Sequence, residues 1–332
     1  MSIHGQTPHK SQTNISIAIH GGASNIKNLN LTPEQEQAYL SALDSALDLG
    51  YNMLKSGSTA IDAVSSVVVF MENNPLFNAG RGAVISADST IQMDAAIMDG
   101  SNLKCGAVAG VKTTKNPILV AKTILQKSNY IFLYGNGAED FAKENGLEIV
   151  DPSYFRTDYR WNQFQKVIHT DTVKLDNDTK GSIDPIDELK NEKYGTVGAV
   201  ALDQYGNLAA ATSTGGLLNK KYNRIGDTPI IGAGTYANNA TCAVSCTGKG
   251  EDFIRLVVGH EISARMRFKH ESLQKAVNNV IQTDLKSVNG RGGCIAIDKK
   301  GQVAISFTTS GMFHAYIDAN GKRKTAIYKE EY

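Results

Sequence analysis

The sequence predicts a layered protein of mixed α and β structure, either α/β or α+β. Strand-like runs of apolar and β-branched residues occur in both halves of the chain, and helix-like segments lie between them. The chain has 332 residues, of which 41% are hydrophobic, so it can bury a large core as one unit or as two domains. Helices and sheets with one apolar face bury that face by stacking in layers.

The composition argues against several classes of protein. The 34 basic residues nearly balance the 33 acidic ones, which disfavours binding to nucleic acid or to an anionic membrane. No apolar stretch is long enough to span a membrane, and the first residues lack the apolar core of a signal peptide. Four scattered cysteines read as buried free thiols, because Cys242 and Cys246 lie too far apart along one strand for a disulfide. We therefore expect a cytoplasmic protein with flexible residues 1–13.

The predicted elements of the first half follow in order. A short buried strand at 15–19 leads into His20 and its glycines. Thr32-Pro33-Glu34-Gln35 is a helix start with a capping box, and Gly57 ends that helix. Ser58 is expected to cap a second helix, which is followed by a loop rich in Asn and Gly. Further strands are expected at 91–98, 107–111 and 130–134, with helices at 117–126 and 138–144.

Residues 171–195 differ from everything around them. Of these 25 residues 11 are charged, and no amphipathic period is visible, so we expect an exposed and mobile linker. Beyond it we expect a hairpin at 197–214, a glycine-rich loop to 234, a strand at 242–247, one long helix from 250, a helix at 272–283, and strands at 294–298 and 303–308.

The hairpin is the most informative segment of the sequence. Two runs of small and apolar residues, 197–202 and 208–214, flank the turn sequence Asp-Gln-Tyr-Gly-Asn. If the turn is centred on Tyr205, Thr196 falls opposite Thr214, and cross-strand partners have Cβ atoms about 4.5–5.5 Å apart. The register therefore predicts two neighbouring hydroxyl groups.

Thr196 is a candidate nucleophile, although a threonine that opens a strand usually has no special role. A threonine needs a base close by, and an N-terminal threonine finds one in its own α-amino group. The charged linker runs directly into this residue, and Gly195 before it can adopt backbone conformations closed to other residues. We therefore hypothesise that the chain is cut between Gly195 and Thr196.

Two further segments have both an ordinary and a functional interpretation. Arg224 and Asp227 are either a solvated pair or a socket for a zwitterion, in which Arg binds an α-carboxylate and Asp an α-ammonium. The turn at Thr247-Gly248 is either an ordinary connection from strand to helix or a site whose N–H groups stabilise an oxyanion. The latter segment lacks the glycines and hydroxyl residue of a nucleotide-binding loop, the histidines show no metal spacing, and His20 is best explained as a satisfied strand-end residue.

These segments occur together in one known family. The chain resembles the plant-type L-asparaginase/isoaspartyl peptidase group of N-terminal nucleophile hydrolases from His20 to Thr308, which is nearly its whole length. The resemblance is carried by NPLFNAGRGAV (74–84), MDAAIMDG (93–100), GAVAGV (106–111), GTVGAVALD (195–203), AATSTGG (210–216), NRIGDTPIIGAGTYA (223–237) and AVSCTGKGEDFIR (243–255). It implies a four-layer αββα sandwich of α+β class.

The resemblance further implies a single-domain precursor that cuts itself before Thr196. The products would be an α chain of residues 1–195, with core 14–170, and a β chain of 196–332, and two such αβ units would pair. The implied site residues are Thr196 as nucleophile, Thr214 as its neighbour, Thr247 and Gly248 as the oxyanion hole, and Arg224, Asp227, Gly250 and Asn78 as the substrate contacts.

The resemblance implies no cofactor for catalysis, but it implies a structural Na⁺ held mainly by backbone carbonyls of a loop. The corresponding residues here are Met71, Glu72, Asn74, Phe77, Ala79 and Arg81. Two positions depart from the family pattern, namely Ser24, where a glycine is common, and His314, near which an arginine is common. These changes could alter the turn at residue 24 and the response to pH or substrate.

The resemblance implies hydrolysis of L-asparagine and β-aspartyl dipeptides through a Thr196 acyl-enzyme that releases L-aspartate. A rival enzyme is the glycosylasparaginase branch, which resembles TSTNG where this chain has Thr214-Gly215-Gly216 and which is lysosomal or secreted. A rival of another class is a non-catalytic amino-acid-binding protein that uses Arg224 and Asp227 and is never cut.

Overall fold

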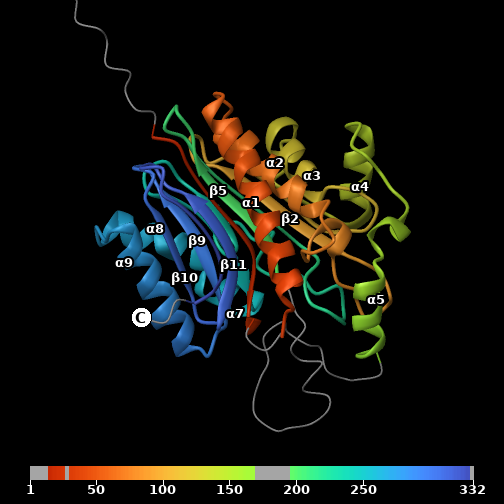
Figure 1. Cartoon of the computed structure of the whole chain (residues 1–332). Coiled ribbons are helices and arrows are strands. Elements are labelled where there is room, and N and C mark those ends of the chain that lie inside the picture. The colour runs from red at the N-terminus through yellow and green to blue at the C-terminus, as the bar shows by residue number, and fades with distance from the viewer. Residues whose placement is uncertain (1–13, 27–29, 169–194, 330–332) are drawn as a thin grey trace, which may run out of the picture.

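The computed structural model describes residues 14–26, 30–168 and 195–329, and these residues form mixed α and β structure, as expected (Figure 1). The predicted linker lies outside the described residues except for Gly195, and the predicted flexible residues 1–13 also lie outside them. Within the described ranges, no helix is both long and apolar enough to cross a lipid bilayer.

The described strands form two sheets. The first has eight strands in the order β12-β11-β1-β5-β6-β2-β3-β4, and the second has four in the order β10-β9-β8-β7. The strands of the first sheet are β1 (Ser16–Ser24), β2 (Met93–Asp99), β3 (Cys105–Val111), β4 (Phe132–Tyr134), β5 (Val197–Leu202), β6 (Leu208–Thr214), β11 (Gly311–Ile317) and β12 (Arg323–Tyr328). Those of the second are β7 (Thr235–Ala237), β8 (Cys242–Gly248), β9 (Gly292–Asp298) and β10 (Val303–Phe307). Neighbouring strands are antiparallel except β3 and β4.

The strands lie between two groups of helices (Figure 1). On one side are α1 (Pro33–Lys55), α2 (Ala60–Glu72) and α3 (Pro117–Lys127), and on the other are α7 (Gly250–Leu256), α8 (Val258–Phe268), α9 (Leu273–Asn278) and a π-helix (Asn279–Leu285). The helices α4 (Gly135–Glu144) and α5 (Asp158–Gln165) and two 3₁₀ turns (Gly80–Gly82 and Pro152–Phe155) complete the described elements.

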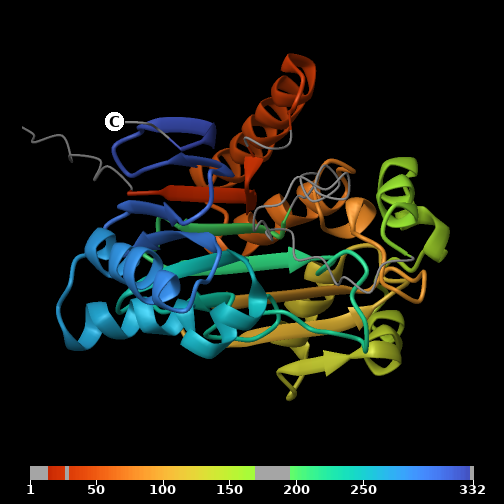
Figure 2. The ribbon, with the colours of Figure 1, turned by 90° about the horizontal axis from the view of Figure 1, so that it is seen from below.

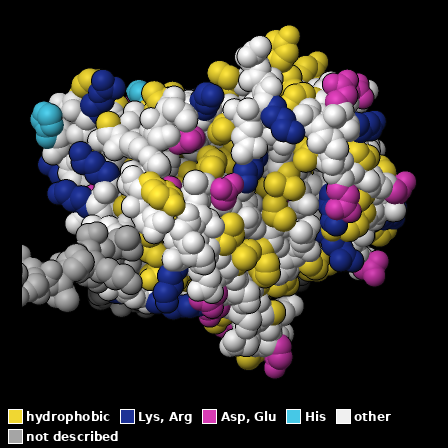
Figure 3. Space-filling model, turned by 90° about the horizontal axis from the view of Figure 1, so that it is seen from above, with side chains coloured by type: hydrophobic (Ala, Val, Ile, Leu, Met, Phe, Trp, Pro, Cys, Tyr) yellow, Lys and Arg dark blue, Asp and Glu magenta, His cyan; other side chains and the backbone are white. Residues whose placement is uncertain are grey.

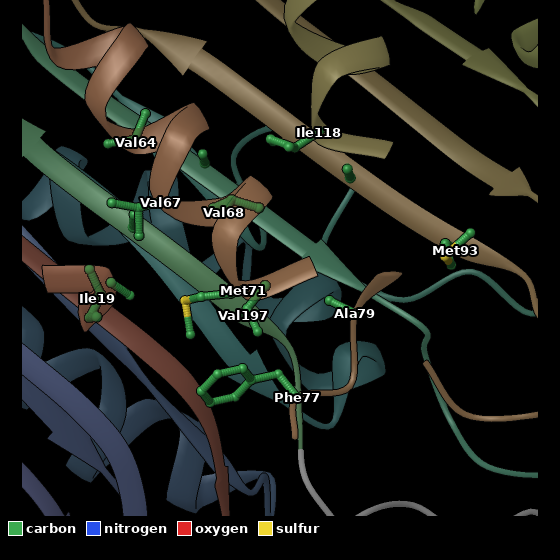
Figure 4. Close-up of a cluster of buried hydrophobic side chains, with 14 of the residues drawn as sticks. Ile19, Val64, Val67, Val68, Met71, Phe77, Ala79, Met93, Ile118 and Val197 are labelled. Carbon is green, nitrogen blue, oxygen red and sulfur yellow. The ribbon is translucent and has the colours of Figure 1, made fainter. Parts of the chain in front are cut away.

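Three apolar clusters hold these elements together. The largest lies between α1–α3 and the eight-stranded sheet, and it includes Val64, Val68 and Met71 of α2 and Val197 of β5 (Figure 4). A second cluster packs the inner faces of the two sheets, and a third packs the four-stranded sheet against α8 and α9. Because β1 lies between β11 and β5, both halves of the sequence build the same sheet; Figure 2 shows the red β1 beside the green β5.

Local signals predicted several features correctly. Thr32 accepts from the N–H of Gln35, and the Gln35 side chain accepts from the N–H of Thr32, which completes the capping box. Gly57 after α1 has a φ of 93°. The hairpin has strands β5 and β6 with the expected bounds and register. The cap of α2 is Thr59 and not Ser58, because the Thr59 side chain accepts from the N–H of Asp62.

The prediction of one long helix from residue 250 is wrong, because the structure has two helices there. Val257 has φ 48° and ψ 47°, a left-handed conformation that breaks the helix into α7 and α8. The break lets the N–H of Gly259 donate to the carbonyl of Ala233 and that of His260 to Gly232. Tertiary hydrogen bonds to the glycine-rich loop therefore outweigh local helix preference. The strands β7, β11 and β12 and the helix α5 were not predicted.

Candidate active site

The expected meeting of two hydroxyl groups is confirmed. The Thr196 hydroxyl donates to the Thr214 hydroxyl at 3.2 Å, and Thr214 also accepts from the N–H of Gly216 at 2.9 Å. Both threonines are buried, with exposed fractions of 7% and 3%. They line a small pocket together with Ala23, Gly195, Gly216, Leu217, Arg224, Gly226, Asp227, Thr228 and Gly248.

Gly195 lies against the predicted oxyanion residue Thr247. A Cβ atom on Gly195 would stand 2.8 Å from the Thr247 hydroxyl and would press on the backbone of Gly22. The Thr247 hydroxyl is buried and has no hydrogen-bond partner among the described residues. A buried hydroxyl without a partner is costly, so this donor is available to an oxygen atom that enters the pocket.

Asp227, which lines this pocket, also has an unsatisfied atom. Its Oδ2 is buried and finds no partner in the part of the chain that the structure describes. Burial raises the pKa of Asp227 to about 7, although the nearby Arg224 opposes this. The Asp227 carboxylate lies closely against Gly234 and Gly250, where a Cβ atom would come within 2.8 and 2.9 Å of its oxygens. The site therefore offers an acceptor for a buried ammonium group.

Arg224 is paired with a residue that sequence reasoning missed. Its Nε and Nη2 both donate to the Glu251 carboxylate at 2.9 Å. The Arg224 side chain is 17% exposed and that of Glu251 is 47% exposed. An α-carboxylate that binds Arg224 would share the guanidinium with Glu251 or displace it. A local signal existed, since Glu251 lies in the first turn of α7, which begins at Gly250.

Asn78 lies behind the pocket and not among its lining residues. Its side-chain N–H donates to the carbonyl of Gly216 at 2.9 Å, and its side-chain oxygen accepts from the N–H of Val84 at 3.0 Å. These bonds support the turn at Gly215 and Gly216, which follows Thr214. A direct substrate contact of Asn78 stays a prediction.

The loop predicted to bind sodium connects α2 to the 3₁₀ turn at Gly80. The carbonyls of Met71, Asn74 and Ala79 each accept an N–H within the loop. The Arg81 side chain turns away and lies over the Tyr154 ring, 5.6 Å from its centre. Phe77 is buried in the apolar cluster of Figure 4. Within the described ranges, no group of three or more His, Cys, Asp or Glu side chains is placed to hold a metal.

The Glu72 side chain has a role that the sequence did not reveal. It accepts from the hydroxyl of Ser213 at 2.6 Å, from the N–H of Ile118 at 3.0 Å and from the Asn116 amide at 3.1 Å. Burial raises the pKa of Glu72 to about 7 in spite of these bonds. This carboxyl group therefore ties α2 and α3 to the strand that carries Thr214.

Comparison with known proteins agrees with this geometry. The profile of a family described as asparaginase matches residues 13–327. The chain belongs to the asparaginase family. Its relatives in that family include an isoaspartyl peptidase of Escherichia coli K12, which is 46% identical over 315 residues that cover 95% of this chain and 96% of the relative.

Eukaryotic members of the asparaginase family are similar over the same length. A probable isoaspartyl peptidase/L-asparaginase 2 of Arabidopsis thaliana is 41% identical, with 95% of this chain and 99% of the relative covered. An isoaspartyl peptidase/L-asparaginase of Rattus norvegicus is 38% identical, with 97% and 91% covered. The predicted membership is therefore confirmed along nearly the entire chain.

Proposed function

We propose that the chain is a self-cleaving isoaspartyl peptidase/L-asparaginase, a hydrolase that releases L-aspartate from β-aspartyl dipeptides and L-asparagine. The observation that carries this proposal is one pocket that joins Thr196 and Thr214 to Arg224 and Asp227. A nucleophile beside a clamp for an α-carboxylate and an α-ammonium suits a substrate with a free aspartyl amino-acid end. The names of the relatives support the same activity.

In the proposed reaction, the Thr196 hydroxyl oxygen attacks the side-chain carbonyl carbon of the aspartyl unit. The α-amino group of Thr196 takes the hydroxyl proton and passes it to the leaving amine as the C–N bond breaks. The Thr247 hydroxyl and the Gly248 N–H donate to the oxyanion. Water then attacks the ester, its proton returns through the amine to the Thr196 oxygen, and aspartate leaves.

The base in this scheme exists only after the chain is cut. A free α-amino group has a pKa of about 7.7–8.0, so a useful fraction is neutral near pH 7. We therefore propose that the Gly195–Thr196 peptide is cut by Thr196 itself. The contact of Gly195 with the Thr247 hydroxyl supports this, because the oxyanion donor then already lies beside the scissile peptide.

Mass spectrometry of Thr196→Ala and Thr196→Ser variants tests the proposal. Thr196→Ala is expected to stay a single chain and to release no aspartate. Thr196→Ser keeps both a hydroxyl and an α-amino group, so it is expected to be cut and to retain activity. A Thr196→Ala protein that still splits after residue 195 contradicts the scheme.

The alternatives are less well supported. The relatives quoted above are isoaspartyl peptidases and L-asparaginases, which disfavours the glycosylasparaginase branch and a non-catalytic binding protein. Rates of hydrolysis of β-aspartyl-leucine and of N-acetylglucosaminyl-asparagine distinguish an isoaspartyl peptidase from a glycosylasparaginase. We expect β-aspartyl-leucine to react faster. A wild-type chain that never splits would favour the binding protein.

Further properties of the molecule belong to the same proposal. A four-layer αββα sandwich is supported by the three apolar clusters between successive groups of elements. A dimer of αβ units follows from the family resemblance and is tested by the molar mass in solution.

A cytoplasmic location is supported by the four cysteines, which are free thiols. The interspersed charges on the face in Figure 3 fit a small-molecule substrate better than nucleic acid.

We also propose that the loop from Met71 to Arg81 holds a structural Na⁺ through backbone carbonyls. The carbonyls of Glu72, Pro75 and Phe77 lie so close to Gly80 or Gly82 that a Cβ atom on either glycine would collide with them. Such crowding of carbonyl oxygens suits a small hard cation. Thermal unfolding in NaCl is expected to occur at a higher temperature than in choline chloride of equal ionic strength.

A further inference from the structure

His20 is a fully buried histidine that the proposed reaction does not use. Its ring is 0% exposed and lies at the contact between the two sheets. Nδ1 is 3.0 Å from the carbonyl oxygen of Thr196, and Nε2 is 2.9 Å from the hydroxyl of Ser245. The ring therefore joins the candidate nucleophile to a strand of the second sheet.

The partners of His20 determine its protonation state. A carbonyl oxygen only accepts, so Nδ1 carries the hydrogen. Burial lowers the pKa of His20 to about 3, although the bond to Thr196 opposes this, and the ring is neutral near pH 7. A neutral imidazole has one N–H, so Nε2 accepts from the Ser245 hydroxyl.

The donor and acceptor roles of three further hydroxyl groups follow from the same rule. Because Ser245 donates to His20, it must accept from Thr212, whose hydroxyl is 2.8 Å away. Thr212 in turn accepts from the hydroxyl of Thr235 at 2.7 Å. The hydroxyl hydrogens thus point from Thr235 through Thr212 and Ser245 to His20, whose Nδ1–H points to the Thr196 carbonyl. Each hydroxyl has one hydrogen, so the contacts of Thr212 with the Gly234 carbonyl at 3.4 Å and of Thr235 with the Thr228 carbonyl at 3.1 Å are the alternatives that this arrangement does not use. These five residues come from both sheets, and all are buried.

Gly198 makes room for this arrangement. It pairs with His20 in the register of β1 and β5, and a Cβ atom on it would collide with both the Ser245 hydroxyl and His20 Nε2. Gly198 does not have a left-handed φ, so its lack of a side chain is explained by space and not by backbone conformation. The sequence of β5 is therefore fitted to the His20–Ser245 bond.

Thr196 is held less firmly by its strand than the residues that follow it. It precedes β5, whose pairing with β6 begins at Val197 and whose pairing with β1 begins at Gly198. Once the chain is cut before Thr196, this residue becomes a chain end, and chain ends fray unless something ties them down. The bond from His20 to its carbonyl supplies such a tie.

We propose that His20 is a positioning residue for Thr196, held as the Nδ1–H tautomer by the hydroxyl chain of Ser245, Thr212 and Thr235. It fixes the Thr196 main chain so that the new α-amino group and the hydroxyl keep their places after the cut. This inference rests on the proposed function. His20 touches neither the substrate nor the reacting atoms, so it acts through Thr196.

The tautomer is tested by NMR of protein labelled with ¹⁵N in histidine. The spectrum of the wild type at pH 7 is expected to contain a neutral Nδ1–H signal that is absent from His20→Asn. The Nδ1–H signal of His314, whose Nδ1 is 2.7 Å from the Met312 carbonyl, is expected to remain in the variant. A His20 signal that is cationic, or that is protonated on Nε2, overturns the inference. This measurement needs no enzyme activity, so its outcome is separate from that of the proposed function.

Kinetics of two His20 variants test the positioning role. Asn places an amide N–H near the position of Nδ1, whereas Gln places its amide near Nε2. We expect His20→Gln to lower kcat by about 100-fold with KM changed less than about 2-fold, because a misplaced reacting group slows the chemical step. His20→Asn is expected to recover at least about 10-fold of that kcat. Equal losses in the two variants, or a loss confined to KM, contradict the proposal.

Ser245→Ala tests the hydroxyl chain without changing His20. It is expected to lower kcat by about 10-fold, since the tautomer loses its partner. The matched control is Ser263→Ala, which removes a buried serine hydroxyl that likewise pairs with a threonine, Thr241, at 2.6 Å. The control is expected to keep kcat. Equal kcat values for Ser245→Ala and Ser263→Ala would show that the chain has no positioning effect.

Discussion

At the scale of single residues, two unsatisfied polar atoms bear directly on the proposed chemistry. The Thr247 hydroxyl and the Oδ2 atom of Asp227 are buried without partners among the described residues, although buried polar groups are normally bonded. Each lies where the proposed substrate would supply the missing partner. In the proposed complex, hydrogen bonds to the substrate would offset the cost of burying these two groups.

The first prediction concerns the pH dependence of activity. The pKa of Asp227 is about 7 in the free protein, and only the ionised form attracts an ammonium group. The α-amino group of Thr196 must also be neutral to act as the base. We therefore expect kcat/KM to fall as the pH drops below about 8. Below about pH 7 both groups bind a proton, so the slope of log(kcat/KM) against pH is expected to approach two. A flat profile of kcat/KM between pH 6 and pH 8 would contradict this assignment.

The second prediction concerns the Thr247 hydroxyl. Thr247→Val keeps the shape of the side chain and removes the donor, so kcat is expected to fall by about 100- to 1000-fold, or about 3–4 kcal/mol. KM should change little, because the oxyanion exists only along the reaction path. Thr247→Ser keeps the donor and serves as the control. Equal kcat values for the Val and Ser variants would remove Thr247 from the oxyanion hole.

At the scale of elements, the break between α7 and α8 is the clearest conflict between local and tertiary preference. Val257 is β-branched and stands at φ 48°, a conformation that costs such a residue roughly 1–2 kcal/mol. The N–H groups of Gly259 and His260 donate to carbonyls of the loop at Gly232 and Ala233, which is close in sequence to Asp227. The strain is therefore retained because it helps to fix the loop that carries the proposed substrate clamp.

The third prediction follows from this strain. Val257→Gly is expected to raise the free energy of unfolding by about 1 kcal/mol, because glycine adopts the left-handed conformation readily and the Val257 side chain is 44% exposed. The control is Val258→Gly, which removes a side chain that is 0% exposed, and it should lower that free energy by at least about 2 kcal/mol. Urea denaturation measures both. A Val257→Gly protein that is clearly less stable than wild type would refute the strain argument.

At the scale of the whole molecule, polar side chains as well as apolar clusters join the layers. Glu72 connects two helices to β6, and His20 connects β1 to β8 of the other sheet. Such links position groups accurately, but they depend on protonation state. The stability of the folded protein is therefore expected to depend on pH through these buried groups.

The fourth prediction uses the pKa of His20, which is about 3 in the folded state and about 6.5 in an unfolded chain. Between these values the unfolded state binds a proton that the folded state does not, so stability falls as the pH decreases from 6.5 to 3. The His20 contribution to this loss is on the order of 5 kcal/mol.

Chemical denaturation at several pH values tests the fourth prediction. Thr196→Ala provides the background, because it should unfold as one covalent chain. In a protein that carries both Thr196→Ala and His20→Gln, the free energy of unfolding is expected to fall less steeply between pH 6.5 and pH 4 than in Thr196→Ala alone. Parallel curves for the two proteins would show that His20 titrates normally in the folded state.

The sequence by itself determined what depends on neighbours along the chain. Apolar alternation and turn residues fixed the hairpin and its register, so the meeting of Thr196 and Thr214 could be predicted without a structure. The capping box at Thr32 and the mixed α and β class followed from equally local signals. The proposed roles of the site residues came from long motifs shared with a family.

Only the tertiary structure decided which distant groups meet. His20 and Ser245 are 225 positions apart, and the Glu72 side chain reaches Ser213 across 141 positions. The break at Val257 likewise depends on carbonyls of a loop more than twenty residues earlier in the chain. No spacing rule predicts such contacts, because their free energy arises only after both sheets have packed and water has left the space between them.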